Sequence, residues 1–158
     1  MPEAVLAIDP GPVESAYVLW RPSGELRADK LSNAEVLARI EQYAPLVDVA
    51  AIEMIASYGM AVGAEVFETC VWIGRFYACA EQHKAKDIRL IRRLAVKLHH
   101  CQTAKAKDSN IRQALIDKYG APGTKKNPGT TYGLAGDTWQ AFALATCLTE
   151  PSDGREIR

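Results

Sequence analysis

The sequence predicts one α/β domain built on a mixed β-sheet, for three reasons. Short apolar segments of strand length open the chain and recur between helices. The first three are separated only by short turns, which is typical of an antiparallel meander. The later ones alternate with helical patterns, which is typical of parallel strands joined by crossover helices. We assign the domain to residues 1–150 and expect residues 151–158 to be a flexible tail.

The first half of the chain supplies three strands and one helix. Residues 4–8 are all apolar, as in a strand that is buried on both faces. Residues 15–20 form a second strand after a Pro/Gly turn, and residues 26–31 form a third after the turn RPSGE. Ser32 is the expected N-cap of the helix that follows, because Glu35 completes a capping box with it.

The second half alternates strands with helices. Residues 46–54 (LVDVAAIEM) follow a helix, so we expect them to pair in parallel with an earlier strand through a right-handed crossover. A long apolar helix over residues 59–82 comes next, and residues 87–91 form a short fifth strand. Three more helices are predicted, over residues 92–100, 107–119 and 137–148. The prediction is therefore a mixed five-stranded sheet with helices on both faces.

The composition is that of an ordinary globular protein, with 48% hydrophobic and 24% charged residues. We find neither an apolar run long enough to span a membrane nor a secretory signal, so we expect a cytoplasmic protein. The four cysteines form no CxxC pair, and we expect reduced thiols, mostly in the core. A zinc site built from Cys101, His99 and His100 is an alternative that the spacing does not favour.

The charges are distributed unevenly along a chain whose formal net charge is zero. Residues 84–126 contain twelve Lys or Arg against three Asp, a charge of +9, and the rest of the chain carries −9. Such a segment is either a solvated helical face or a surface that binds nucleic-acid phosphates.

Three carboxylates occur where predicted elements begin or end. Asp9 ends the first strand, Glu53 lies near the end of the strand over 46–54, and Asp137 opens the last helix. If the two strands are parallel neighbours, Asp9 and Glu53 emerge side by side. They then repel unless a cation lies between them, and Mg²⁺ prefers such oxygen ligands. Each acid also has a structural explanation: a turn residue, a solvated strand end and a helix N-cap, respectively.

Four segments in this order resemble the RuvC-like Holliday junction resolvases of the RNase H-like superfamily, and the overall form is similar to phage-type members. The segments are AIDPGPVES, AAIEM, RRLAVKLHHCQTAKAKDSNIRQALIDKYG and GDTWQAFALATCL. The resemblance spans nearly the whole chain. It implies an RNase H-like fold and a homodimeric, Mg²⁺- or Mn²⁺-dependent endonuclease of bacterial or phage-infected cytoplasm. Its substrate would be branched DNA, a four-way junction cut by paired symmetric nicks, with neither a membrane partner nor a nucleotide cofactor.

The resemblance assigns catalysis and metal binding to Asp9, Glu53 and Asp137. The family usually has a further acid one turn into the closing helix, where this sequence has Gln140. The amide oxygen of Gln140 can bind a metal ion but brings no charge. Either the three acids suffice, or Asp108 contributes, or the ion binds more weakly.

The resemblance also assigns residues to DNA. Lys107 is a candidate catalytic residue, because a lysine near the scissile phosphate offsets transition-state charge. After Glu53, Tyr58 is placed to stack on a base and Met60 to act as an apolar wedge. The other candidate DNA-binding residues are Arg92, Lys97, Lys105 and Arg112.

The long helix bears on the choice between functions. Its residues Phe67, Val71, Trp72 and Phe76 recur at helical spacing, which suits a helix shared between the core and a twofold partner. The main alternative is another RNase H-like nuclease, acting on RNA–DNA hybrids, flaps or branched DNA. An ATPase of the actin or sugar-kinase type needs two such domains, for which the chain is too short. A catalytically inactive DNA-binding module does not explain three acids that would repel DNA.

Overall fold

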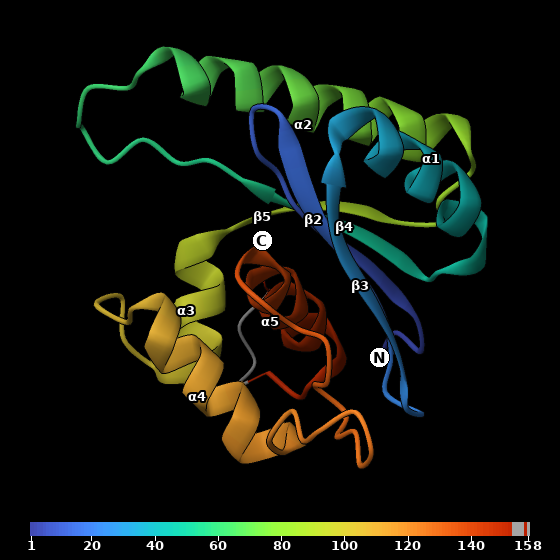
Figure 1. Ribbon diagram of the computed structural model, residues 1–158. Coiled ribbons are helices and arrows are strands. Elements are labelled where there is room, and N and C mark those ends of the chain that lie inside the picture. Colours follow the sequence, from blue (N-terminus) through green and yellow to red (C-terminus); the bar gives the residue numbers. More distant parts are fainter. Residues whose placement is uncertain (153–156, 158) are drawn as a thin grey trace.

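The computed structural model describes residues 1–152 and 157, and it contains one five-stranded sheet (Figure 1). The strands are β1 (Val5–Asp9), β2 (Glu14–Arg21), β3 (Glu25–Ser32), β4 (Val49–Met54) and β5 (Ile88–Arg92), in the order β3-β2-β1-β4-β5. Strands β1, β2 and β3 form the predicted antiparallel meander, whereas β4 pairs in parallel with both β1 and β5. The mixed sheet is confirmed. The expected tail falls mainly on residues 153–156 and 158, which lie outside the described residues.

Helices cover both faces of this sheet, as predicted (Figure 1). One face carries α1 (Asn33–Tyr43) and α2 (Ala64–Gln82), with the 3-10 segment η1 (Ala44–Leu46) leading into β4. The other face carries α3 (Arg93–Cys101), α4 (Asp108–Tyr119) and α5 (Asp137–Thr149). Because successive side chains of a strand point to opposite faces, Leu6 and Ile8 join the core under α1 and α2, while Val5 and Ala7 join the core under α5.

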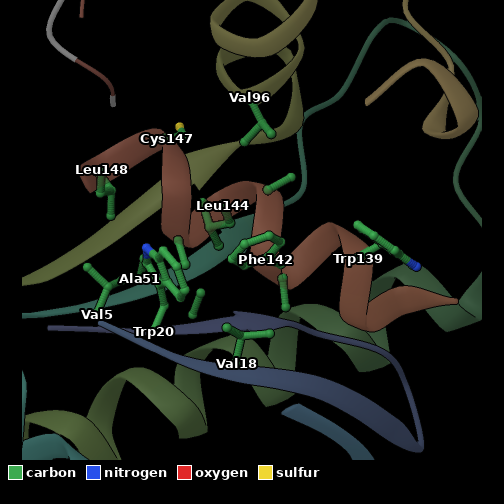
Figure 2. Close-up of a cluster of buried hydrophobic side chains, with 14 of the residues drawn as sticks. Val5, Val18, Trp20, Ala51, Val96, Trp139, Phe142, Leu144, Cys147 and Leu148 are labelled. Carbon is green, nitrogen blue, oxygen red and sulfur yellow. The ribbon is translucent and has the colours of Figure 1, made fainter. Parts of the chain in front are cut away.

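Helix α5 is the centre of the second layer. Every residue from Thr138 to Leu148 is buried, because the helix lies between the sheet on one side and α3 and α4 on the other. Trp20 of β2 packs edge-on against Phe142, with ring centroids 5.1 Å apart (Figure 2). A helix enclosed in this way is fixed relative to the strands, and so is Asp137 at its first position.

The long helix begins later than the sequence pattern predicts. We expected it from residue 59, whereas α2 starts at Ala64 after an extended connection. Gly59 has a φ of +77°, a left-handed conformation that interrupts a right-handed helix. The capping box is present as predicted: the Ser32 hydroxyl accepts a hydrogen bond from the Glu35 N–H, and the Glu35 carboxylate accepts one from the Ser32 N–H.

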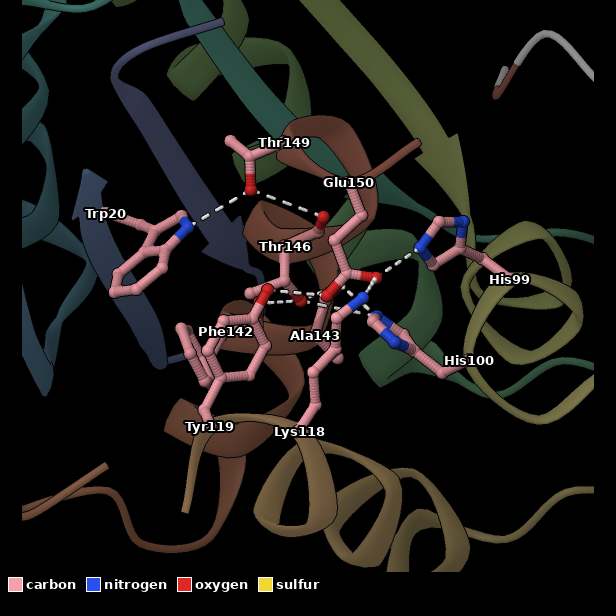
Figure 3. Close-up of polar contacts among 10 residues, drawn as sticks. All are labelled: Trp20, His99, His100, Lys118, Tyr119, Phe142, Ala143, Thr146, Thr149 and Glu150. Carbon is pink, nitrogen blue, oxygen red and sulfur yellow. Dashed lines mark hydrogen bonds and ion pairs between the residues drawn. The ribbon is translucent and has the colours of Figure 1, made fainter. Parts of the chain in front are cut away.

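A buried polar network joins the last turns of α3, α4 and α5 (Figure 3). Its centre is Glu150, whose side chain is 8% exposed. The Tyr119 hydroxyl donates to this carboxylate, His99 Nε2 lies 2.7 Å from it and Lys118 Nζ lies 3.0 Å from it. Burial alone raises the pKa of Glu150, but the hydrogen bonds from these three side chains outweigh burial and lower it to about 2. The ionised carboxylate therefore stabilises the packing of the three helices.

We predict that Glu150→Gln lowers the free energy of unfolding by ~2–3 kcal/mol at neutral pH. The pKa of Glu150 is lower in the folded protein than its ordinary value of 4.5, so its contribution is present above about pH 4.5 and is lost as the pH falls towards 2. Urea denaturation at several pH values measures both effects. The control is Glu81→Gln, which removes an exposed acid of α2. Equal stability of the two variants at neutral pH would show that the network contributes nothing.

Candidate metal centre

Asp9 and Glu53 lie at the carboxyl ends of neighbouring parallel strands. The register of β1 and β4 pairs Ile8 with Ile52, so the next residue of each strand emerges at the same edge of the sheet. The side chains of Asp9 and Glu53 are only 13% and 16% exposed. Carboxylates so far from water require a compensating positive charge. The topology therefore creates the close acidic pair that the sequence predicts.

Asp137 approaches this edge from the other layer. It is the first residue of α5, and its carboxylate lies 2.9 Å from Lys30 Nζ on β3. The interpretation of Asp137 as a helix N-cap is wrong, because Gly136 occupies that position. The side chain is half-exposed, so a ligand can reach it.

Arg93 lies among the acids and binds three of them. Its Nε and Nη2 lie 2.9 Å and 3.3 Å from the two carboxylate oxygens of Glu53. Its Nη1 donates to Asp108 over 2.9 Å, and Nη2 lies 3.9 Å from Asp9 Oδ1. Burial alone would lower the pKa of Arg93, but the hydrogen bonds and charges of these acids outweigh burial and raise it. Arg93 is therefore fully charged.

Arg93 and Lys30 are site residues that no motif in the sequence indicates. Their positions follow from the strand registers. The β4–β5 register pairs Met54 with Arg92, so Arg93 follows at the same edge as Glu53. The antiparallel registers pair Asp9 with Ala16 and Ala16 with Lys30, which aligns Lys30 with the acidic edge. Arg93 is the first residue beyond the observed β5, whereas the predicted fifth strand, residues 87–91, would have pointed to Arg92 instead.

Asp9 lies in an environment that disfavours its ionised form. Desolvation, followed by repulsion from Glu53, raises its pKa to about 8, and Arg93 offsets this only in part. Within residues 1–152 and 157, no donor lies within hydrogen-bonding distance of the Asp9 carboxylate. A desolvated carboxylate beside a second one, with no donor of its own, fits a hard divalent cation such as Mg²⁺ or Mn²⁺. The donor set of the site consists of oxygens, which these ions prefer.

The protein's own cations hold two of the three predicted ligands: Arg93 is bound to Glu53, and Lys30 is bound to Asp137. Among the described residues, the carboxylates of Asp9, Glu53 and Asp137 do not all lie within 4.8 Å of one another. Metal binding would therefore require these side chains to move inward.

One other group of side chains contains residue types that bind metal ions. His99, His100 and Glu150 have candidate ligand atoms within 4.8 Å of one another. However, the Lys118 ammonium contacts Glu150, and His100 Nε2 lies 2.8 Å from a backbone carbonyl oxygen, which can only accept a hydrogen bond. These contacts explain the group without an ion. Cys101 does not belong to it, so the zinc alternative is wrong; all four cysteines are free.

Both candidates for a fourth metal ligand lie beside Asp137. Gln140, one turn further along α5, is buried, and Asp108 is the first residue of α4. Together with Asp137 and Arg112 they line a cavity of about 220 Å³. The structure thus brings Gln140 and Asp108 to the same side of the acidic centre.

Some of the predicted DNA-binding residues line cavities beside the acids, and the others are exposed on neighbouring segments. Tyr58 and Lys97 line a cavity of about 570 Å³ together with Glu53 and Arg93. Tyr58 and Met60 are exposed on the connection that precedes α2, which Figure 1 shows extending away from the sheet. The remaining basic residues are exposed around the starts of α3 and α4: Arg92, Lys105, Lys107 and Arg112.

We predict that the metal-free protein loses stability as the pH rises and that Asp9→Asn removes much of this loss. The pKa of Asp9 is higher in the folded protein than its ordinary value of 3.8, so its contribution is fully present below about pH 4 and is lost as the pH rises towards 8. In chelator at about pH 8.5, the variant should be more stable than the parent by ~2 kcal/mol. Urea denaturation checks this. Glu81→Gln serves as the control, and an unstabilised Asp9→Asn would contradict the account of desolvation.

No helix in the described part of the chain combines the length and hydropathy needed to cross a membrane. Comparisons with protein-family models and with curated proteins gave no match. Two solved structures are similar over almost the whole chain. The Thermus thermophilus RuvC structure is 15% identical, with a TM-score of 0.66 over 91% of this chain and 92% of that chain. T. thermophilus RuvC in complex with Holliday junction substrate is 13% identical, with a TM-score of 0.67 over 92% of each chain. The chain therefore has the RNase H-like fold of RuvC that the four sequence segments predict.

Proposed function

We propose that this protein is a divalent-metal-dependent endonuclease that resolves four-way DNA junctions by paired symmetric nicks. The observation that carries the proposal is that Asp9 and Glu53 emerge at one edge of the sheet, where the charge of Asp137 also acts on Asp9. Support comes from the similarity of the fold to RuvC in complex with Holliday junction substrate. The RNase H-like arrangement supplies the acids, and the basic segment supplies a surface for the DNA backbone.

Asp9, Glu53 and Asp137 would hold two Mg²⁺ or Mn²⁺ ions, with Gln140 or Asp108 as the further ligand. Such ions, when bound, activate a water molecule and stabilise the leaving oxygen of a phosphodiester. The chain's own contribution is to fix the acids on three elements of the core. Lys107 immediately precedes Asp108, and we assign it to offsetting charge on the scissile phosphate.

The location of the basic residues supports binding of a DNA backbone. The +9 segment, residues 84–126, comprises β5, α3, α4 and their connections. Lys97 lines the cavity beside Glu53, and Arg112 lines the cavity beside Asp137, so basic side chains lie on both sides of the acids. Contacts to phosphate position DNA without reading its sequence. Tyr58, exposed beside the first cavity, is assigned to stacking on an unpaired base at the branch point.

We predict that the purified protein with Mg²⁺ or Mn²⁺ cuts a synthetic four-way junction with nicks at symmetry-related positions. Asp9→Asn should lower the rate by at least about a hundredfold while junction binding persists, since the acid acts in chemistry and the basic surface binds. Gel analysis of labelled strands measures the cutting, and a mobility-shift assay measures the binding. Glu81→Gln is the matched control and should cut normally.

The substrate panel separates the candidate functions. Linear duplex, a flap and an RNA–DNA hybrid of the same sequence are assayed beside the junction. Preference for the hybrid or the flap would replace junction resolution with the other RNase H-like nuclease activities. Cutting that survives Asp9→Asn would remove the metal centre itself from the proposal.

We also propose that the protein forms a homodimer and that α2 forms the interface. Phe67 and Val71 are each 63% exposed and lie one turn apart on this helix, and the Arg75 guanidinium stacks 4.0 Å above the Trp72 ring. Phe76, by contrast, is fully buried, so α2 divides its apolar residues between the core and the outside, as the sequence pattern indicates. A second copy of the same face would cover this surface and place two catalytic centres on one junction.

We predict that Phe67→Glu converts a dimer into a monomer, because a charge on the twofold surface faces its own copy. Analytical ultracentrifugation measures the mass, and the junction assay should then show single nicks in place of paired ones. Leu46→Glu is the control, since Leu46 is similarly exposed on η1, away from α2. A parent protein that sediments as a monomer would contradict the assignment.

A further inference from the structure

Arg93 occupies the carboxylate oxygens that a metal ion would need. Its planar guanidinium places Nε and Nη2 on the two oxygens of Glu53, at 2.9 Å and 3.3 Å. The same group reaches Asp108 at 2.9 Å and approaches Asp9 at 3.9 Å. One side chain of α3 thereby bridges acids from β1, β4 and α4. This is the arrangement of a counter-ion rather than that of a surface arginine.

Two other basic residues, Lys30 beside the acids and Arg92 next to Arg93 in sequence, do not bridge the acids in this way. Lys30 contacts Asp137 alone. Arg92, the adjacent arginine, is exposed and forms no ion pair with any residue in the described ranges. Among the residues that the structure describes, only Arg93 therefore links several of the acids, and its removal would leave them without their main positive charge.

We propose that Arg93 competes with the divalent metal ion for Glu53: it offsets part of the negative charge of the acidic centre in the metal-free protein and releases Glu53 when the ion binds. This inference rests on the metal centre assigned under the proposed function. Two positive groups cannot share the same two oxygens at close range without strong repulsion. The cavity of about 570 Å³ beside Glu53, which Arg93 itself lines, offers the displaced guanidinium space next to Lys97.

If Arg93 competes with the metal ion, its loss should affect metal binding in the opposite direction to the loss of an arginine that only supports the fold. If Arg93 only supports the fold, its loss weakens every property of the site. If Arg93 competes, its loss strengthens metal binding, because the ion no longer displaces a cation and meets more uncompensated negative charge. The conservative lysine keeps a positive charge but loses the bidentate fork. It should therefore bind metal with intermediate affinity.

The test measures Mn²⁺ binding without DNA, by electron paramagnetic resonance of free Mn²⁺ and by calorimetry. We expect Arg93→Gln to bind Mn²⁺ about tenfold more tightly than the parent. The affinity of Arg93→Lys for Mn²⁺ should lie between those of the parent and Arg93→Gln. Because the lysine variant keeps the positive charge, it also serves as the test if Arg93→Gln folds poorly. Arg92→Gln is the matched control, since it makes the same change in net charge one residue away, and its affinity should change by less than about twofold.

Thermal unfolding supplies a readout that is independent of affinity. In chelator, Arg93→Gln should unfold at a lower temperature than Arg92→Gln, and added Mn²⁺ should raise its unfolding temperature more than that of the parent. Unchanged or weaker Mn²⁺ binding by both Arg93 variants would overturn the competition while leaving the metal centre in place. Absence of Mn²⁺ binding by the parent and all variants would overturn the metal centre together with this inference.

Discussion

The repulsion between Asp9 and Glu53 is the constraint around which this molecule is organised. Parallel pairing of β1 with β4 brings two largely buried carboxylates to one edge of the sheet, where desolvation and mutual repulsion oppose ionisation of Asp9. The surrounding structure has to supply the compensation, and it does so with cations from two further elements, Arg93 of α3 and Lys30 of β3.

The layer formed by α3, α4 and α5 has opposite electrostatic properties at its two ends. Around Glu150, the donors His99, Tyr119 and Lys118 satisfy an ionised carboxylate and join the helices firmly. At the other end, where the same helices begin, the acidic side chains outnumber the basic side chains that form ion pairs with them. The enclosed helix α5 connects the two ends, so the favourable contacts of Glu150 help to hold Asp137 at the electrostatically unfavourable acidic end.

The sequence allows most of the fold to be predicted, because the strands, the capping box and the closing helix each leave a local pattern. The positions of Asp9, Glu53 and Asp137 follow from the ends of those elements. What the pattern cannot supply is register. Lys30 and Arg93 reach the acids only through strand pairing across the sheet, and Glu150 meets His99 across 51 positions of sequence. The predicted start of the long helix at residue 59 was wrong, because the apolar spacing continues through a connection that Gly59 interrupts and that is not helical.

The number of negative charges at the acidic centre explains why an amide is tolerated at Gln140. Asp9, Glu53, Asp108 and Asp137 already supply four acids, and all the other three raise the pKa of Asp9. A carboxylate at position 140 would be buried one turn from Asp137 and would add a fifth negative charge to the centre. A neutral side chain avoids that cost. Asp108, which Arg93 holds from a different helix, adds a fourth negative charge, so the carboxylates of the acidic centre come from four separate elements.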